Sequence, residues 1–147
     1  MLNVARILVP TDFSPNSLKA LACAKEIARK FGSEVVVVHV VEPPVYPVTL
    51  DVGAVGAPDL SAEIDRYVEE QLARLVQEHG RDVKLRPVRR RGAPFEQILA
   101  AATAEKADLI LIATHGYTGL KHVLLGSTAE KVIRKAACPV LVVRAEA

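Results

Sequence analysis

The chain has 147 residues, of which 50% are hydrophobic and 24% charged, and its formal net charge at pH 7 is +2. This length fits a single domain spanning 1–147, which can bury roughly 68–70% of its unfolded surface without disulfides or metals. The near-neutral charge excludes the broad positive surface that non-specific nucleic-acid binding requires. Three Phe, three Tyr and no Trp are scattered along the chain, so they form no stacking platform for single-stranded bases.

The ends and the cysteines set expectations about the cellular environment. The first residues lack the basic region, apolar stretch and cleavage site of a secretory signal. No apolar run approaches the ~18 residues that span a bilayer. Cys23 and Cys138 belong to no CxxC pair, so we expect two buried thiols rather than a zinc site or a redox motif. The sequence therefore predicts a cytoplasmic protein that binds no membrane and no nucleic acid.

The first elements in the chain are a strand, a helix and a second strand. A continuous apolar run at residues 7–9 predicts a strand that is buried on both faces. Ser14 and Pro15 supply an N-cap residue and a proline in the first helical position. The apolar period that follows predicts a helix ending at Gly32. Another continuous apolar run, at residues 35–41, predicts a second buried strand.

The connection at residues 42–57 interrupts this alternation. It combines prolines and glycines with several valines. Connections of this length are uncommon in compact domains and are often lids or partner contacts. A tolerated insertion is an equally open interpretation. The apolar stripe that follows, from Leu60 to Val76, predicts a second helix that ends at Gly80.

The second half of the chain predicts three more strands and two more helices. Residues 83–88 alternate and are basic, which favours a strand near the sheet edge. Pro94 begins a helix, residues 109–113 form a buried strand, Ser127 begins another helix, and residues 140–143 form the last strand. Five strands thus alternate with four helices. This order predicts an α/β fold: one doubly wound domain with a five-stranded parallel sheet and helices on both faces.

Ligands of such sheets bind beyond the carboxyl ends of the strands, where the strand order reverses. Three loops stand there, at residues 10–14, 91–94 and 114–127. Asp12 follows the first buried strand, so its carboxylate is placed for ribose hydroxyls or for a Mg²⁺ ion that accompanies phosphates. An Asx turn that starts the first helix is the alternative role for Asp12. Basic residues gather in segment 81–91 and predict a solvated strand face, although Arg91 stands near the ligand end.

The loop at residues 114–127 is rich in groups that bind phosphate. Gly116 and Gly126 allow backbone amides to approach an anion, and Gly126 with Ser127 opens a helix whose N-terminus carries partial positive charge. The alternative is a capping box, in which Ser127 caps the helix and Glu130 reaches back.

Two common phosphate-binding classes are excluded by their missing fingerprints. The chain has no GxxxxGK[ST] and no GxGxxG, so neither a P-loop nucleoside triphosphatase nor a dinucleotide-binding Rossmann domain is supported. A response-regulator receiver domain would have an acidic residue after the third strand and a lysine after the fifth. Arg91 and Arg144 stand at those places, so that assignment fails.

At these residues the chain resembles the universal stress protein family, from Val4 to Arg144. Residues 7–14 look like the first strand and loop of that family, residues 39–40 look like the end of its second strand, and residues 126–143 look like its last helix and strand. The nucleotide-binding branch carries G-2x-G-9x-G-[ST]. The spacing is kept in this chain, with Ala113 in place of the first glycine.

The resemblance implies a Rossmann-like fold of the adenine nucleotide alpha hydrolase type and an ATP- or AMP-binding regulatory module of the stress response. It implies that adenine and ribose contact Pro10, Thr11, Asp12 and Val40. It implies that the phosphates contact Ala113, His115, Gly116, Gly126, Ser127 and Thr128. With ATP, Mg²⁺ is expected at Asp12.

The resemblance also implies a homodimer that pairs through the last strand. Residues 140–143 form an apolar strand at the end of the sheet, and pairing with its symmetry mate would remove an exposed edge.

Two other functions stay open at this point. An enzyme that cleaves or transfers the bound phosphate would use His115, Lys121 and His122 for charge stabilisation and Asp12 for the metal. No base with an orienting partner is visible, so no catalytic residue is assigned. A nucleotide-free dimeric interaction module is the other alternative, with Ala113 as the sign of lost binding.

Overall fold

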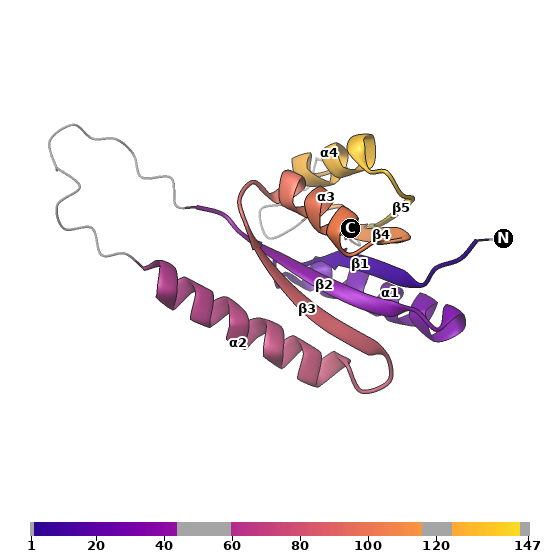
Figure 1. The fold of residues 1–147 in the computed structure, drawn as a ribbon, viewed down its shortest axis with the longest axis horizontal. Helices are drawn as coiled ribbons and strands as arrows, with labels where there is room; N and C mark the ends of the chain where they lie inside the picture. The colour runs from indigo at the N-terminus through magenta and orange to yellow at the C-terminus, as the bar shows by residue number, and fades with distance from the viewer. Residues whose placement is uncertain (1, 44–59, 116–124, 145–147) are drawn as a thin grey trace, which may run out of the picture.

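A computed structural model of the chain describes residues 2–43, 60–115 and 125–144. The described strands are all parallel and form one sheet in the order β3-β2-β1-β4-β5. This confirms the predicted α/β fold, with β3 at one edge and β5 at the other. The elements in chain order (Figure 1) are β1 (Arg6–Pro10), α1 (Pro15–Phe31), β2 (Glu34–Val41), α2 (Ser61–His79), β3 (Lys84–Arg91), α3 (Pro94–Ala104), β4 (Leu109–Ala113), α4 (Ser127–Lys135) and β5 (Val140–Val143).

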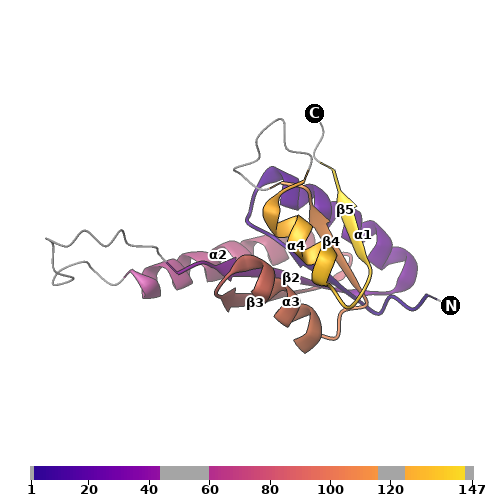
Figure 2. The same ribbon diagram turned by 90° about the horizontal axis from the view of Figure 1, so that it is seen from above.

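The helices cover both faces of the sheet. Helices α1 and α2 lie on one face, and α3 and α4 lie on the other (Figures 1 and 2). Each face has its own apolar cluster, because side chains alternate along a strand. Ile7 and Val9 belong to the cluster under α1 and α2, whereas Leu8 between them belongs to the cluster under α3 and α4. Burial on both faces explains why the central strands are apolar without interruption.

The predicted helix signals around α1 are present. The Ser14 hydroxyl accepts a hydrogen bond from the Ser17 amide, 3.2 Å from N to O, and caps the helix. Gly32 ends it in the left-handed conformation, with φ of 68°. Among the described helices, none has the length and apolar character needed to cross a membrane. The connection at residues 42–57 lies outside the described residues beyond position 43.

Two smaller predictions need correction. Strand β3 extends to Arg91, because Arg91 pairs with Val41 of β2. Arg91 is therefore the last residue of a strand and not the first residue of a loop. Cys23 and Cys138 are free and half-buried rather than buried. Even this burial raises the pKa of both thiols, which keeps them protonated near neutral pH.

The sheet divides into two halves at its carboxyl edge. The ladder between β1 and β4 pairs Ile7 with Leu109 and Leu8 with Ile110, and its register stops there. By contrast, the ladders of β1 with β2 and of β4 with β5 continue to Pro10 and Ala113. The strand order reverses between β1 and β4, so the carboxyl edge at this position is the expected place for a ligand.

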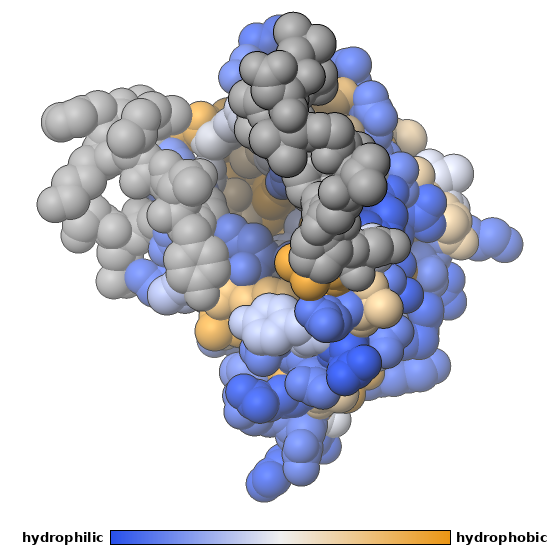
Figure 3. Space-filling view, turned by 90° about the vertical axis from the view of Figure 1, so that its left-hand side faces the viewer, coloured by the Kyte–Doolittle hydropathy of each residue, from blue (hydrophilic) through white to orange (hydrophobic). Residues whose placement is uncertain are grey.

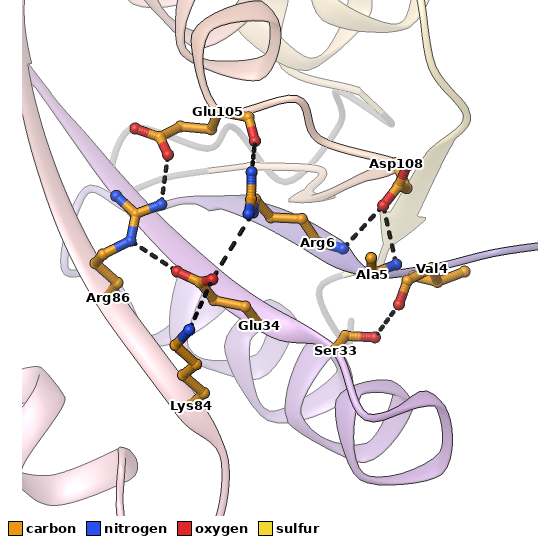
Figure 4. A network of polar contacts seen from close by, with 9 residues as sticks. All are labelled: Val4, Ala5, Arg6, Ser33, Glu34, Lys84, Arg86, Glu105 and Asp108. Carbon is orange, nitrogen blue, oxygen red and sulfur yellow. Dashed lines mark hydrogen bonds and ion pairs between the residues drawn. The ribbon is translucent and has the colours of Figure 1, made fainter.

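The amino edge of the sheet carries a network of charged side chains (Figure 4). Glu34 at the start of β2 pairs with Arg86 at 2.7 Å, with Lys84 at 3.4 Å and with Arg6 at 3.8 Å. Arg86 also pairs with Glu105 at the end of α3. The Glu34 side chain is only 12% exposed, so three cations from β1 and β3 converge on one largely buried carboxylate of β2.

The cations of this network shift the titration of its acids. The hydrogen bond from Arg86 is the main reason that the pKa of Glu34 lies below its ordinary value. The same guanidinium lowers the pKa of Glu105. A carboxyl group whose pKa is lower in the folded chain than in the unfolded chain stabilises the fold above the unfolded pKa, and this stabilisation is lost as the pH falls through the folded pKa.

Glu34→Gln is therefore expected to lower the free energy of unfolding at pH 7 by about 1–2 kcal/mol, because it leaves three cations without their common anion. The loss should shrink as the pH falls below the unfolded pKa and disappear below the folded pKa, where Glu34 is protonated in both states of the parent. Urea unfolding at pH 7 and pH 3 measures both effects. Glu130→Gln is the control, because Glu130 is half exposed and its ion pair within the described part of the chain is an exposed helical one with Arg134, where less than about 0.5 kcal/mol is expected.

Candidate functional site

A cavity of about 280 Å³ opens at the carboxyl edge of the sheet, where β1 and β4 separate. This volume lies near the lower end of the range for small-molecule sites, about 300–1,000 Å³. Figure 3 looks onto this edge and shows a hollow with apolar surface inside. The lining residues come from β1, β2, β4, the N-terminal parts of α1, α3 and α4 and the adjoining loops; they are Pro10, Thr11, Asp12, Ser17, Val38, His39, Val40, Glu42, Pro94, Ile98, Ile112, Ala113, Thr114, His115, Gly126, Ser127, Thr128 and Ala129.

The cavity brings together nine of the ten contact residues expected from the sequence. Gly116 is the tenth and lies outside the described residues, as do Lys121 and His122. Pro94 belongs to the loop at residues 91–94 that was expected at the ligand end. Sequence reasoning did not assign the other lining residues Ser17, Val38, His39, Glu42, Ile98, Ile112 and Ala129. His39 adjoins the expected contact at Val40, so its position near the end of β2 was the available signal. The predicted contact residues in the lining are Pro10, Thr11, Asp12, Val40, Ala113, His115, Gly126, Ser127 and Thr128.

Hydroxyl groups fix the loop between β1 and α1. The buried Thr11 hydroxyl lies 2.9 Å from the Ser17 hydroxyl and accepts a hydrogen bond from the Phe13 amide at 3.0 Å. The Ser17 hydroxyl in turn donates to the Ser14 carbonyl at 2.9 Å. The Thr11 amide continues the sheet by donating to the Val38 carbonyl. The loop is therefore tied both to β2 and to the first turn of α1.

Phe13 adopts an uncommon backbone conformation at the cavity. Its φ is 64°, a left-handed value that bulky side chains rarely adopt. The Phe13 ring stacks on the His39 ring with centroids 4.6 Å apart. His39 Nδ1 lies 2.8 Å from the Thr11 carbonyl oxygen, so Nδ1 carries the proton and donates it to that carbonyl. Stacking and hydrogen bond together hold the strained loop against β2.

Asp12 forms the Asx turn that the sequence analysis gave as its alternative role, and it also lies at the cavity. One carboxylate oxygen accepts a hydrogen bond from the Ser14 amide at 3.0 Å, which forms the predicted Asx turn. The side chain is exposed and lines the cavity. The turn therefore positions the carboxylate at the cavity.

Gly126 stands where two backbone segments meet closely. Its amide donates to the Thr114 carbonyl over 2.7 Å. A Cβ atom at this position would lie 2.9 Å from the same carbonyl oxygen, closer than side-chain carbon atoms approach backbone oxygens. Only glycine fits here without a backbone shift, and this close approach brings the start of α4 to the end of β4.

Helix α4 begins differently from the predicted capping box. Gly126 is the N-cap and has no side chain to cap the helix, and Ser127 is the first helical residue. The capping-box prediction was therefore wrong by one position, because the close contact with Thr114 requires glycine at the cap. The first amides of a helix have no partner within it. At α4 these amides adjoin the exposed Ser127 and the half-buried Thr128, which line the cavity.

Ala113 is one of the lining residues of the cavity, and it packs with the cluster under α1 and α2. Val38, Ile98 and Ile112, which line the cavity, belong to the cluster under α3 and α4. Side chains alternate along β4, so an alanine at position 113 leaves the space above Ile112 open.

The charged groups at the cavity are few. Its lining within the described residues carries the carboxylates of Asp12 and Glu42 and the imidazoles of His39 and His115, and no lysine or arginine. Arg91, expected near the ligand end, instead pairs with Asp65 at 2.5 Å. Within residues 2–43, 60–115 and 125–144, no three His, Cys, Asp or Glu side chains gather into a metal-binding group.

The fold and the cavity together define an α/β protein with a cavity at the switch point of a doubly wound sheet, where proteins of this class bind their ligands. Comparison with known sequences makes this class specific. The family model described as "Universal stress protein family" matches residues 3–144. The universal stress protein MJ0531 of Methanocaldococcus jannaschii is 38% identical over 141 residues, which cover 95% of this chain and 81% of the relative. The chain belongs to the universal stress protein family.

Solved structures agree with this assignment. The structure of protein MJ0577 of Methanocaldococcus jannaschii has a TM-score of 0.82 and 30% identity, and the match covers 98% of each chain. A universal stress protein from Archaeoglobus fulgidus in complex with dAMP has a TM-score of 0.65 and 24% identity, and the match covers 97% of this chain and 98% of the other. This second likeness is one of fold.

Replacement of two serines tests the start of α4. Ser127→Ala is expected to change the free energy of unfolding by less than about 0.5 kcal/mol, because Ser127 does not cap the helix. Ser14→Ala, the matched variant at the true cap of α1, should cost about 1 kcal/mol. Urea unfolding of both variants measures the difference. Equal losses would show that Ser127 caps α4 after all.

Proposed function

We propose that this protein is an adenine-nucleotide-binding regulatory module that acts as a homodimer in the stress response. The observation that carries the proposal is the cavity itself, which combines the Asp12 carboxylate with the N-terminus of α4 at Gly126 and Ser127. ATP and AMP are the ligands that we propose. The cytoplasmic location and the single domain over residues 1–147 stay predictions from the sequence.

The chemistry of the lining fits such a ligand. Backbone amides at the start of α4, the Ser127 hydroxyl and the Thr128 hydroxyl are suited to a phosphate. The Asp12 carboxylate is suited to accept hydrogen bonds from ribose hydroxyls and, when ATP is the ligand, to contact Mg²⁺, which would neutralise phosphate charge. Pro10 and Val40 supply apolar surface for the adenine ring. The low positive charge of the lining is compatible with a mononucleotide, since helix amides supply the positive potential.

Two further observations support nucleotide binding. The family member from Archaeoglobus fulgidus was solved with dAMP, an adenine mononucleotide. The position of Ala113 also removes the main objection from the sequence, because its methyl group faces the α1 and α2 side of the sheet. These observations favour nucleotide binding over the nucleotide-free alternative.

The two edges of the sheet differ in a way that supports a dimer through β5. Strand β3 carries five cationic side chains and Pro87, features that discourage pairing with another strand. Strand β5 is apolar throughout and exposes 41% of Leu141. Pairing with β5 of a second copy would satisfy the unpaired backbone N–H and C=O groups of this edge strand and cover the Leu141 side chain.

Calorimetry with AMP and with ATP in the presence of magnesium tests the proposed function. We expect binding of both by the purified chain. Asp12→Ala should weaken binding about tenfold or more, because it removes a charged acceptor. Asp12→Asn keeps an oxygen for the Ser14 amide, so a similar loss in this variant assigns the effect to the charge. Asp82→Ala is the control, since Asp82 pairs with Lys25 away from the cavity, 3.2 Å from N to O.

The absence of heat with either nucleotide, and of any nucleotide in an acid extract of the purified protein, would overturn the proposal. Ala113→Gly separates the alternatives further. If this variant binds nucleotide and the parent does not, the nucleotide-free interaction module is the correct reading.

Leu141→Lys is expected to convert the dimer into a monomer, because it places two charges at the paired β5 edges. Light scattering coupled to size-exclusion chromatography measures the mass in solution. Tyr67→Lys is the matched control: Tyr67 is 59% exposed on α2, which packs on β3 at the opposite edge, so the dimer should persist. A parent chain that is monomeric at micromolar concentration contradicts the proposal.

A further inference from the structure

The charges that line the cavity disfavour ligands with more than one phosphate group. Its described lining carries two carboxylates, Asp12 and Glu42, and no lysine or arginine. The start of α4 suits one phosphate. Each additional phosphate adds negative charge near those carboxylates, which disfavours binding. Within the described lining no cationic side chain offsets this charge, so a cation that reaches the cavity from outside that lining would favour a longer phosphate chain.

Lys131 is placed to be that cation. It follows Ser127 by four residues on α4, so both side chains lie on the same face of the helix. Ser127 lines the cavity. One helical turn advances about 5.4 Å, a length comparable to the separation of the first and third phosphorus atoms in a triphosphate. Helical side chains also tilt toward the N-terminus, which directs Lys131 toward the cavity end of α4.

A weak contact holds Lys131 beside Phe95 in the first turn of α3. Its ammonium nitrogen lies 4.8 Å from the centroid of the Phe95 ring. Phe95 follows Pro94, a lining residue. The Lys135 ammonium lies over the same ring at 5.2 Å. Two like charges on one ring repel each other, so the departure of one relieves the other.

Neither lysine is tied to an acid. Among the described residues, the ion pair within α4 joins Arg134 to Glu130, and no carboxylate pairs with Lys131 or Lys135. Both lysines are exposed. A contact between an ammonium group and a phosphate is stronger than an exposed contact between an ammonium group and an aromatic ring. Lys131 therefore exchanges Phe95 for a phosphate at little cost.

We propose that Lys131 determines the preference for phosphate chain length at this site: it leaves the Phe95 ring and pairs with the phosphates beyond the first one. The proposal rests on the nucleotide binding proposed above. It assigns no such role to Lys135, which shares the ring contact but stands one turn farther from Ser127.

The test compares affinities for AMP, ADP and ATP at one magnesium concentration by calorimetry. Lys131→Ala should weaken ATP binding about 3- to 10-fold and AMP binding less than about 2-fold. Lys135→Ala should leave both affinities unchanged, although it removes the equivalent contact with Phe95. Lys131→Arg should retain the affinity for ATP, because it retains the charge.

Other results overturn the proposal. The proposal is wrong if Lys131→Ala weakens the binding of AMP and ATP equally. It is also wrong if the two lysine variants have equal effects, or if neither variant changes the affinities. If the parent binds none of the three nucleotides, the proposed function itself fails, which is a distinct result. A measurement on the parent protects the test against misfolded variants: the ε-methylene proton signals of Lys131 should lose their ring-current shift on addition of ATP but keep it with AMP.

Discussion

The structure depends on one constraint, the parallel direction of all five strands. Parallel strands require crossover connections, and the right hand of those crossovers places helices on both faces of the sheet. Every strand then ends at the same edge, and the helix that follows begins there. This arrangement brings the Asx turn after β1 and the N-terminus of α4 after β4 to a common space, although more than a hundred residues separate them.

The sheet differs between the end at which its strands begin, the amino edge, and the end at which they finish, the carboxyl edge. At the amino edge, Glu34 collects Arg6, Lys84 and Arg86, which fixes the starts of β1, β2 and β3 relative to one another (Figure 4). At the carboxyl edge, the β1 and β4 ladder has ended, and the strands are free to diverge around a cavity. Rigid attachment at one edge thus permits an opening at the other without loss of the sheet.

Local sequence signals were sufficient for most of the fold. Continuous apolar runs identified the strands because both faces of this sheet are covered, and Ser14 with Pro15 identified the start of α1. The ends of β3 and the cap of α4 were not predictable in the same way. Strand β3 continues to Arg91 because Val41 pairs with it, and α4 is capped by Gly126 because Thr114 approaches it. Both outcomes depend on partners distant in sequence.

Residues of the candidate site were predictable from the sequence where the backbone conformation permits only one or a few residue types. Asp12 and Gly126 are such positions, since an Asx turn needs a short polar side chain and a close approach needs glycine. The stacking of Phe13 on His39 was not predictable in this way, because the left-handed conformation of Phe13 is imposed by contacts from β2. The face toward which Ala113 points likewise required the register of β4.

The hydrogen bond from the Gly126 amide to the Thr114 carbonyl has a consequence for how this family can vary. It joins two residues that are twelve positions apart in the sequence, Thr114 and Gly126, through the backbone itself. The entropic cost of bringing two such positions together changes slowly with the length of chain between them, by only about 0.6 kcal/mol for each doubling. Folding alone would therefore tolerate insertions and deletions there. The proposed phosphate contacts would instead make the spacing of nine residues between Gly116 and Gly126 a constraint set by the ligand, and length variants between these two positions would test it.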